Sequence, residues 1–272
     1  MRKSIMALAG AVSLLAAGCG SIPELTFVHM TDSQFGFYDY EKEYARYKTA
    51  IELINADAAG DKPVLMVMTG DMVNIANVDT NADFIAASAA LNIPYCVVPG
   101  NHDINIYASD AEAELARYFG SFGKDYYTHD VGEYRFITVN TNLWKYPQAR
   151  TAAHDKWFEE ALRMAKSEGK IIIVAGHSPI FLEDIDEPED RYYNIEPEKR
   201  KWVLDLLKEN EVILYIGGHC HRLLERDWEG IKFRHAETTS TNFDNRPYGY
   251  RMVKIVGRDV VDYRFMPLEK GE

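Results

Sequence analysis

Five clusters of polar residues in this chain follow directly after apolar runs and carry side chains that bind metal ions. Their sequences are DSQ, GDMVN, GNHD, GHS and GHCH, at positions 32–34, 70–74, 100–103, 176–178 and 218–221. Carboxylates, amides and imidazoles supply the oxygen and nitrogen atoms that divalent metals prefer. One catalytic zinc ion usually takes only three protein ligands. The number of clusters therefore favours two metal ions that share a bridging carboxylate, as in hydrolytic phosphoryl transfer.

The last cluster, taken alone, leaves several interpretations open. His219 and His221 stand at positions i and i+2 after an apolar run. Their imidazoles lie on the same face if the strand stays regular, and they diverge if the backbone turns. They could share one metal ion or bind two. A zinc knuckle that uses Cys220 and a polar turn without ligands are the alternatives. The other four clusters favour two metal ions, with Cys220 as a spacer.

Four of the five clusters begin with a glycine. These glycines are Gly70, Gly100, Gly176 and Gly218. Glycine permits a tight turn and a close approach of the backbone to a bound group. Because binding sites in α/β sheets form at the carboxyl ends of the strands, we expect the clusters to meet at one edge.

Apolar runs typical of buried strands alternate with amphipathic helical patterns along the chain. The strand patterns cover residues 25–30, 64–69, 95–98, 134–140, 170–176, 212–218, 250–256 and 260–266, and the helical patterns cover 41–58, 80–92, 152–167 and 197–209. This alternation predicts an α/β fold with buried sheets. The strand-rich part from Val212 onward predicts a second sheet, partly antiparallel, that packs against the first. Without a repeat or linker after Cys19, we expect one domain over residues 19–272.

Residues 1–18 have the order of an export signal. Arg2 and Lys3 precede an apolar run that is too short to span a bilayer comfortably, and the sequence LAAGC follows. This ending resembles a bacterial lipoprotein box. The resemblance implies cleavage before Cys19, lipidation of its thiol and anchoring to a membrane of the bacterial cell envelope. An ordinary buried N-terminal helix is the alternative.

The chain is acidic, with 30 Lys and Arg, 42 Asp and Glu, and a formal net charge of −12. Such a surface repels nucleic acid, so we expect no nucleic-acid polymer as a partner. A small anionic substrate that metal ions hold is compatible with it. Beyond Cys19, we expect Cys96 to be a small buried residue and expect no disulfide between Cys96 and Cys220.

In this order the clusters resemble the signature of the calcineurin-like metallophosphoesterases, which has an Asp-x-His element, then Gly-Asp, Gly-Asn-His-Asp/Glu, Gly-His and Gly-His-x-His. The match runs from residue 32 to residue 221, most of the predicted domain. The resemblance implies a four-layer αββα sandwich of two mixed β-sheets flanked by helices. It also implies hydrolysis of a small phosphate mono- or diester by a hydroxide that bridges two divalent metal ions, which could be Mn, Fe, Zn or Mg.

The resemblance further implies a role for each cluster. The ligands of one metal would be Asp32, Gln34, Asp71 and His221, and those of the second would be Asp71, Asn101, His177 and His219. His102 would stabilise the transition-state oxyanion or protonate the leaving oxygen, and Asn74 would orient His102.

Two positions depart from the family pattern. Gln34 stands where the commonest pattern has His, and its harder amide oxygen tilts the choice weakly toward Mn, Mg or Fe over Zn. Asn74 stands where many relatives have Asp, so we expect it to orient His102 through its side-chain carbonyl without adding charge. The segment also lacks the Tyr that purple acid phosphatases place there, which argues against that branch.

Three loops are candidates for substrate contacts. In residues 239–251, Arg246, Tyr248 and Tyr250 could form a substrate rim, because phosphate attracts Arg and aromatic rings suit a leaving group. Residues 142–150 and 183–194 could also set specificity. Solvated polar loops are the alternative for all three.

Two functions from different classes fit the sequence. The favoured one is a metal-dependent phosphoric ester hydrolase, either a phosphatase or a phosphodiesterase. The other is a lipid-anchored protein that binds metal and phosphate with little turnover, an idea that Gln34 and Asn74 motivate. Every other predicted ligand position is filled, which favours the enzyme.

Overall fold

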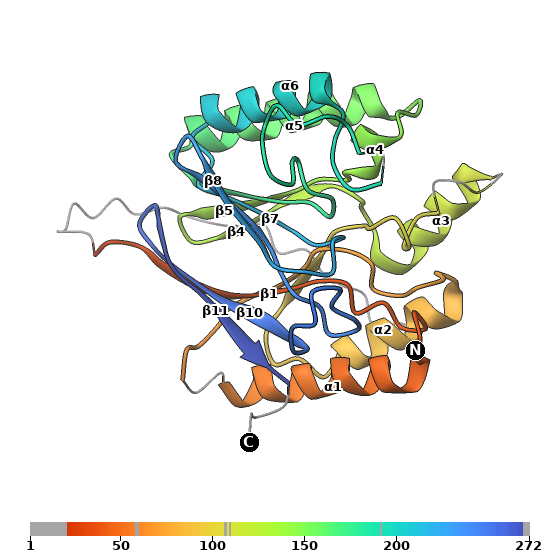
Figure 1. The fold of residues 1–272 in the computed structure, drawn as a ribbon. Coiled ribbons are helices and arrows are strands. Elements are labelled where there is room, and N and C mark those ends of the chain that lie inside the picture. The colour runs from red at the N-terminus through yellow and green to blue at the C-terminus, as the bar shows by residue number, and fades with distance from the viewer. Residues whose placement is uncertain (1–20, 58–59, 106–107, 109, 191, 269–272) are drawn as a thin grey trace, which may run out of the picture.

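The computed structural model describes residues 21–57, 60–105, 108, 110–190 and 192–268 and has four layers, in the order helices, sheet, sheet, helices (Figure 1). The predicted α/β sandwich of two mixed sheets is confirmed. The predicted export signal and Cys19 lie outside the described residues. Within the described ranges, no helix is both long and apolar enough to cross a bilayer.

The first sheet has five strands in the order β11-β10-β1-β2-β3. The strands β1 (Glu24–Met30), β2 (Met66–Met68) and β3 (Tyr95–Val97) run parallel, whereas β10 (Gly249–Val256) pairs antiparallel with β1 and β11 (Asp259–Pro267) pairs antiparallel with β10. Three parallel strands therefore end side by side.

The second sheet has six strands in the order β4-β5-β6-β7-β9-β8. They are β4 (Tyr127–Val131), β5 (Tyr134–Thr138), β6 (Ile171–Ala175), β7 (Leu214–Gly217), β8 (Leu224–Trp228) and β9 (Ile231–His235). The strands β5, β6, β7 and β9 run parallel, and β4 and β8 close the two edges in antiparallel pairs.

The prediction that the chain from Val212 onward forms the second sheet is wrong. The strands β7, β8 and β9 complete a sheet that β4, β5 and β6 begin, while β10 and β11 return to the first sheet. The pairing of β10 runs from Glu24↔Val256 to His29↔Arg251 and occupies the free side of β1. An apolar pattern predicts a strand, but it carries no information about the partner of that strand.

The helices cover the two outer faces. The helices α1 (Tyr40–Asp57), α2 (Val78–Ser88) and α3 (Ala111–Phe122) pack on the first sheet, and α5 (Thr151–Ser167) and α6 (Pro197–Glu209) pack on the second (Figure 1). A single turn, α4 (Asn142–Lys145), follows β5. The prediction that one helix opens at Pro197 is confirmed, and Glu196 caps it. Strands β4, β8 and β9 and helix α3 were not predicted.

A period of two along β1 builds two apolar layers. Leu25 and Phe27 face the second sheet, and Val28 and Met30 face the helices. His29 is fully buried, with Nδ1 2.8 Å from the Tyr263 hydroxyl and Nε2 3.0 Å from Thr69 Oγ1, so it is a hydrogen-bonded histidine of the core. The packed sheets bring the ends of their parallel strands to one edge of the sandwich.

Candidate metal centre

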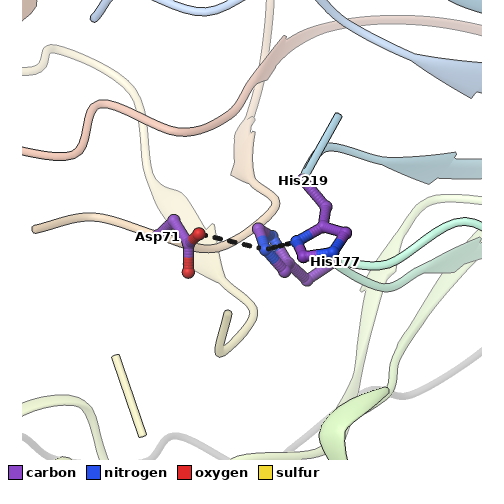
Figure 2. Close-up of side chains that lie close together, drawn as sticks. All are labelled: Asp71, His177 and His219. Carbon is purple, nitrogen blue, oxygen red and sulfur yellow. Dashed lines mark hydrogen bonds and ion pairs between the residues drawn. The ribbon is translucent and has the colours of Figure 1, made fainter. Parts of the chain in front are cut away.

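One group of candidate ligands surrounds His177 (Figure 2). The ligand atoms of Asp71, His177 and His219 all lie within 4.8 Å of one another. His177 Nε2 is 3.2 Å from Asp71 Oδ2, 3.2 Å from Asn101 Oδ1 and 3.2 Å from His219 Nδ1. The structure thus brings together four side chains that the sequence places after four different strands, close enough to bind one cation.

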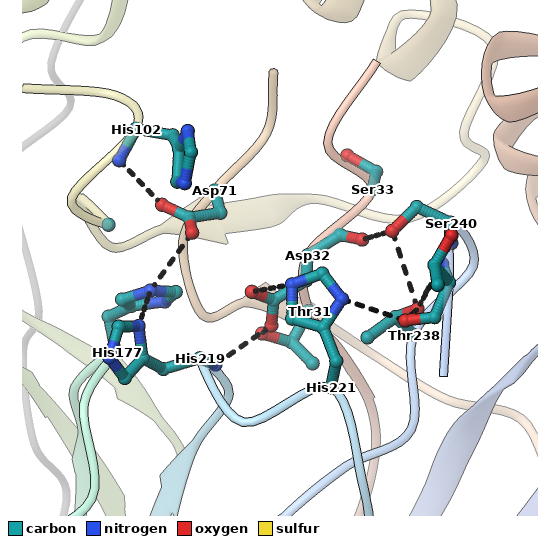
Figure 3. A network of polar contacts seen from close by, with 12 residues as sticks. Thr31, Asp32, Ser33, Asp71, His102, His177, His219, His221, Thr238 and Ser240 are labelled. Atoms are coloured by element: carbon teal, nitrogen blue, oxygen red, sulfur yellow. Dashed lines mark hydrogen bonds and ion pairs between the residues drawn. The ribbon is translucent and has the colours of Figure 1, made fainter. Parts of the chain in front are cut away.

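A second group lies beside the first and comes from β1 and β7 (Figure 3). His221 Nε2 is 3.3 Å from Asp32 Oδ1. Asp32 Oδ1 and Gln34 Oε1 are buried and accept no hydrogen bond from the described residues. A buried acceptor without a partner costs about 1–3 kcal/mol, which a bound cation would offset. The donors of both groups therefore fit divalent metal ions.

Main-chain carbonyls orient His177 and His221. His177 Nδ1 lies 2.7 Å from Thr69 O, and His221 Nδ1 lies 2.7 Å from Thr241 O. Because a carbonyl oxygen only accepts, each Nδ1 carries a proton, so in the neutral imidazole the lone pair is on Nε2. These contacts select the tautomer that a metal ligand needs.

His219 is oriented the opposite way. Its Nε2 donates to Tyr192 O at 2.5 Å, which leaves the Nδ1 lone pair on the side of His177. Lys145 Nζ also donates to Tyr192 O and lies 3.4 Å from His219 Nε2. Burial and the neighbouring His177 hold the pKa of His219 well below its ordinary value, so its imidazole is neutral.

The candidate ligands occupy an uncommon backbone conformation. Asp32, Gln34, Asp71, His219 and His221 have φ between 40° and 71°, in the left-handed region. Only a few per cent of non-glycine residues adopt it, at a cost of about 1–3 kcal/mol each. The turn at residues 219–221 separates the two imidazoles, so His219 joins His177 while His221 joins Asp32.

Two of the predicted glycines lie where no side chain fits. A Cβ on Gly100 would approach the Asp71 carboxylate and main chain closer than 3.0 Å, and a Cβ on Gly218 would approach Thr31 and Asp32 as closely. The close approach that the sequence predicted is present at both positions.

Asp103 connects the loops that follow β2 and β3. It is 1 % exposed, and its carboxylate accepts main-chain N–H groups of Asp71 at 2.7 Å, Met72 at 2.9 Å and Gly100 at 2.8 Å. Burial and the nearby Asp71 carboxylate raise the pKa of Asp103 to about 7. Asp103 therefore positions the loop that carries Asp71.

His102 lies next to Asp71, and its main-chain N–H donates to Asp71 Oδ1 at 2.9 Å (Figure 3). The expectation that the Asn74 side chain orients His102 is wrong. The main-chain carbonyl of Asn74 lies 2.8 Å from His102 Nδ1, while the Asn74 side chain donates to Gly36 O. Any residue at position 74 offers that carbonyl, so the exchange of Asp for Asn leaves this contact available.

The predicted substrate rim is only partly at the surface. Tyr250 is 1 % exposed in β10 and packs in the core beneath the helices, so the prediction for Tyr250 is wrong. The strand period turns its side chain inward. Arg246 pairs with Asp244 at 3.0 Å and Arg46 stacks on the Tyr248 ring at 3.9 Å. For Arg246 and Tyr248 a substrate contact stays a prediction.

Two aromatic residues beside the candidate ligands were not singled out from the sequence. The Phe243 ring stacks on His221, with centroids 4.7 Å apart and planes 9° apart. The Tyr192 ring lies 4.9 Å from the His219 ring. Both belong to loops that the sequence placed near the metal edge, so loop position was the available signal.

Cys220 is not one of the ligand atoms that the structure groups together. It is 2 % exposed, and burial raises the pKa of its thiol to about 12. Its sulfur is not part of the ligand group of Asp71, His177 and His219. Cys96 and Cys220 are both free, so the expectation of no disulfide between them is confirmed.

A cavity of about 470 Å³ opens beside His102. Its lining residues are Asn74, Ile75, Ala76, Asn101, His102, Asn105, Glu114 and Tyr192. Of these, Asn101 is a candidate metal ligand, and His102 lies next to the candidate ligand Asp71. A molecule in this cavity would lie against the metal centre.

Comparisons with known proteins agree with this geometry. A family model described as calcineurin-like phosphoesterase matches residues 25–223. The human serine/threonine-protein phosphatase CPPED1 is 27 % identical over 251 residues, which cover 88 % of this chain and 78 % of the relative. A dimetal phosphatase from Danio rerio has the same fold, with TM-score 0.61 and 15 % identity over 90 % of this chain and 99 % of that one. A purple acid phosphatase from yellow lupin superposes with TM-score 0.63 and 15 % identity over 89 % of this chain and 53 % of that one.

We predict that Cys220→Ala keeps bound metal and activity, because the thiol is buried and un-ionised. His221→Ala should lose both, since it removes a candidate ligand. Metal content by mass spectrometry and hydrolysis of an aryl phosphate measure the two variants. Loss of metal from Cys220→Ala would instead support the zinc-knuckle interpretation.

We predict that Asp103→Asn weakens metal binding about 10-fold or more, as loss of an outer-shell contact typically does. The amide cannot accept all three N–H groups that hold the Asp71 loop. Calorimetric titration with Mn²⁺ measures the change. The matched control is Asp110→Asn, which removes charge from the cap of α3 and should leave the metal affinity unchanged. Equal affinities in both variants would contradict the role of Asp103.

Proposed function

The chain belongs to the calcineurin-like phosphoesterase family and hydrolyses phosphoric esters, and we propose that it does so with two divalent metal ions. The first would bind Asp32, Gln34, Asp71 and His221, and the second would bind Asp71, Asn101, His177 and His219. The ions would be Mn, Fe, Zn or Mg. The substrate would be a small phosphate mono- or diester.

The observation that carries this proposal is the position of Asp71 between two groups of donors. Its Oδ2 faces His177 at 3.2 Å. Its loop is bonded to the loop of the other group, since Asp32 donates its N–H to Gly70 O at 3.0 Å and Gln34 donates to Asp71 O at 2.9 Å. A shared carboxylate in this position suits a pair of cations.

Bound divalent cations would supply positive charge to the phosphate oxygens and lower the pKa of water. The chain itself contributes orientation and a proton. With Nδ1 held at Asn74 O, a doubly protonated His102 can donate its other proton to a leaving oxygen. Its position in the wall of the cavity, next to Asp71, supports that role. This arrangement favours turnover over simple binding of phosphate.

We predict that Asp71→Asn reduces both metal content and activity. Wild-type protein should hold about two metal ions per chain, and the variant should lose at least one of them together with about 10³-fold or more in kcat/KM. Elemental analysis and aryl phosphate hydrolysis after reconstitution with Mn, Fe, Zn or Mg provide the measurement. Asp205→Asn, an exposed member of an ion pair on α6, serves as the matched control. A fully active Asp71→Asn variant would refute the assignment.

We also propose that the chain is anchored to a membrane of the bacterial cell envelope through lipid on Cys19. The support is the order of charged, apolar and small residues before Cys19. In a bacterial host fed an alkyne fatty acid, the wild-type chain should carry the label and sediment with membranes. Cys19→Ser should do neither. A wild-type chain without label would overturn this proposal and leave the catalytic one untouched.

A further inference from the structure

The cavity beside His102 is lined by two large apolar side chains from different loops. Ile75, in the loop after β2, is 73 % exposed, and Tyr192, in the loop before α6, is 49 % exposed. Both side chains are large and lie next to a centre made of carboxylates and imidazoles. A ligand that fills the cavity would remove their apolar surface from water, which favours its binding.

The loop that carries Tyr192 is held in place by its own hydrogen bonds, without a ligand. Tyr192 belongs to the loop between β6 and α6. In this loop the Glu187 carboxylate accepts main-chain N–H groups of Leu182 at 2.7 Å and Glu183 at 2.8 Å. The Asn194 side chain donates to Glu187 at 2.5 Å and accepts from the Asp190 N–H at 2.7 Å. The sequence left open a specificity loop or a solvated polar loop here; the structure shows that these polar side chains bond to the loop's own main chain and to one another.

A buried arginine fixes the same loop to α6. Arg200 is fully buried, and its guanidinium donates to Ile185 O at 2.9 Å, Glu187 O at 2.6 Å and Ile195 O at 2.8 Å. A guanidinium presents its donors in a rigid fork, so these bonds define the course of the chain. The main chain of Tyr192 is held in addition by His219, whose Nε2 donates to the Tyr192 carbonyl. The aromatic wall is therefore preorganised.

The charges around the cavity disfavour an anion. Among its lining residues in the described part of the chain there is no Lys or Arg. The one carboxylate in the lining, Glu114, already accepts from Arg117 at 2.6 Å and from the Asn105 N–H at 3.1 Å. The neighbouring cations already have partners, since Arg117 pairs with Glu114 and Lys145 donates to Tyr192 O. A second phosphate or a carboxylate on the leaving group would therefore meet no Lys or Arg in the lining itself.

We propose that this cavity binds the alcohol part of the substrate and selects an uncharged aromatic or apolar group, with Ile75 and Tyr192 as its contacts. The inference rests on the proposed function, because it takes the metal centre as the place of the phosphate. His102, which also lines the cavity, would stand at the ester oxygen that leaves. The chain would thus prefer a monophosphate of an apolar or aromatic alcohol over a nucleoside polyphosphate.

The test compares two esters of primary alcohols, 2-phenylethyl phosphate and ethyl phosphate. Their leaving oxygens are chemically alike, so the ratio of their kcat/KM values reports on contacts to the ring. We expect a ratio of about 10 or more in the wild-type protein. Ile75→Ala and Tyr192→Ala should each lower the ratio about 5-fold, whereas Tyr192→Phe should keep it because the ring is retained. Addition of a carboxylate to the phenyl ring should lower kcat/KM at least about 10-fold.

The matched control is Val261→Ala, an exposed aliphatic side chain on β11 that is absent from the cavity lining. It should leave the ratio at the wild-type value. A wild-type ratio near one, or a ratio that Ile75→Ala and Tyr192→Ala leave unchanged, would overturn the proposal. Failure of the wild-type protein to hydrolyse these two monoesters and a bis-aryl phosphate diester with any of the four metals would instead overturn the proposed function.

Discussion

The structure depends on a buried carboxylate, Asp71, that is 2 % exposed. Its removal from water must be offset by hydrogen bonds and positive charge. The main-chain N–H of His102 and the imidazole of His177 supply part of this, and together they hold the pKa of Asp71 well below its ordinary value despite burial. The carboxylate oxygens of Asp71 and the acceptor atoms beside it can also coordinate cations. The convergence of strand ends, glycines and histidines follows from this requirement.

The backbone at the candidate ligands is strained. Five of the seven predicted ligands have positive φ, a strain that persists only where the surroundings impose it. The surroundings here are two rigid sheets and short bonds between their loops, such as Gly218 N–H to His177 O at 2.8 Å and Ser240 Oγ to Asp32 O at 2.7 Å. Asp103 adds three further bonds to the Asp71 and Gly100 loops. Ligand positions are thus determined by the whole domain rather than by any one cluster.

Buried hydrogen bonds also hold the loop that lies beside the candidate metal centre. Arg200 and Glu187 satisfy main-chain groups of a loop that has no regular secondary structure, and that loop carries Tyr192 to His219. One residue consequently orients a candidate ligand with its carbonyl and forms a cavity wall with its ring. Tyr192 would therefore link the proposed metal site to the proposed choice of substrate.

The sequence alone determined the types and order of the candidate ligands, the glycines before them and the α/β class, because these depend on local chemistry and on short apolar periods. It did not determine which sheet β10 and β11 join, nor that Asn74 acts through its main chain, that Tyr250 is buried, or that Phe243 stacks on His221. Those features depend on contacts between residues far apart in the chain. Only the tertiary structure decides them, because strand pairing and side-chain burial follow from which surfaces meet.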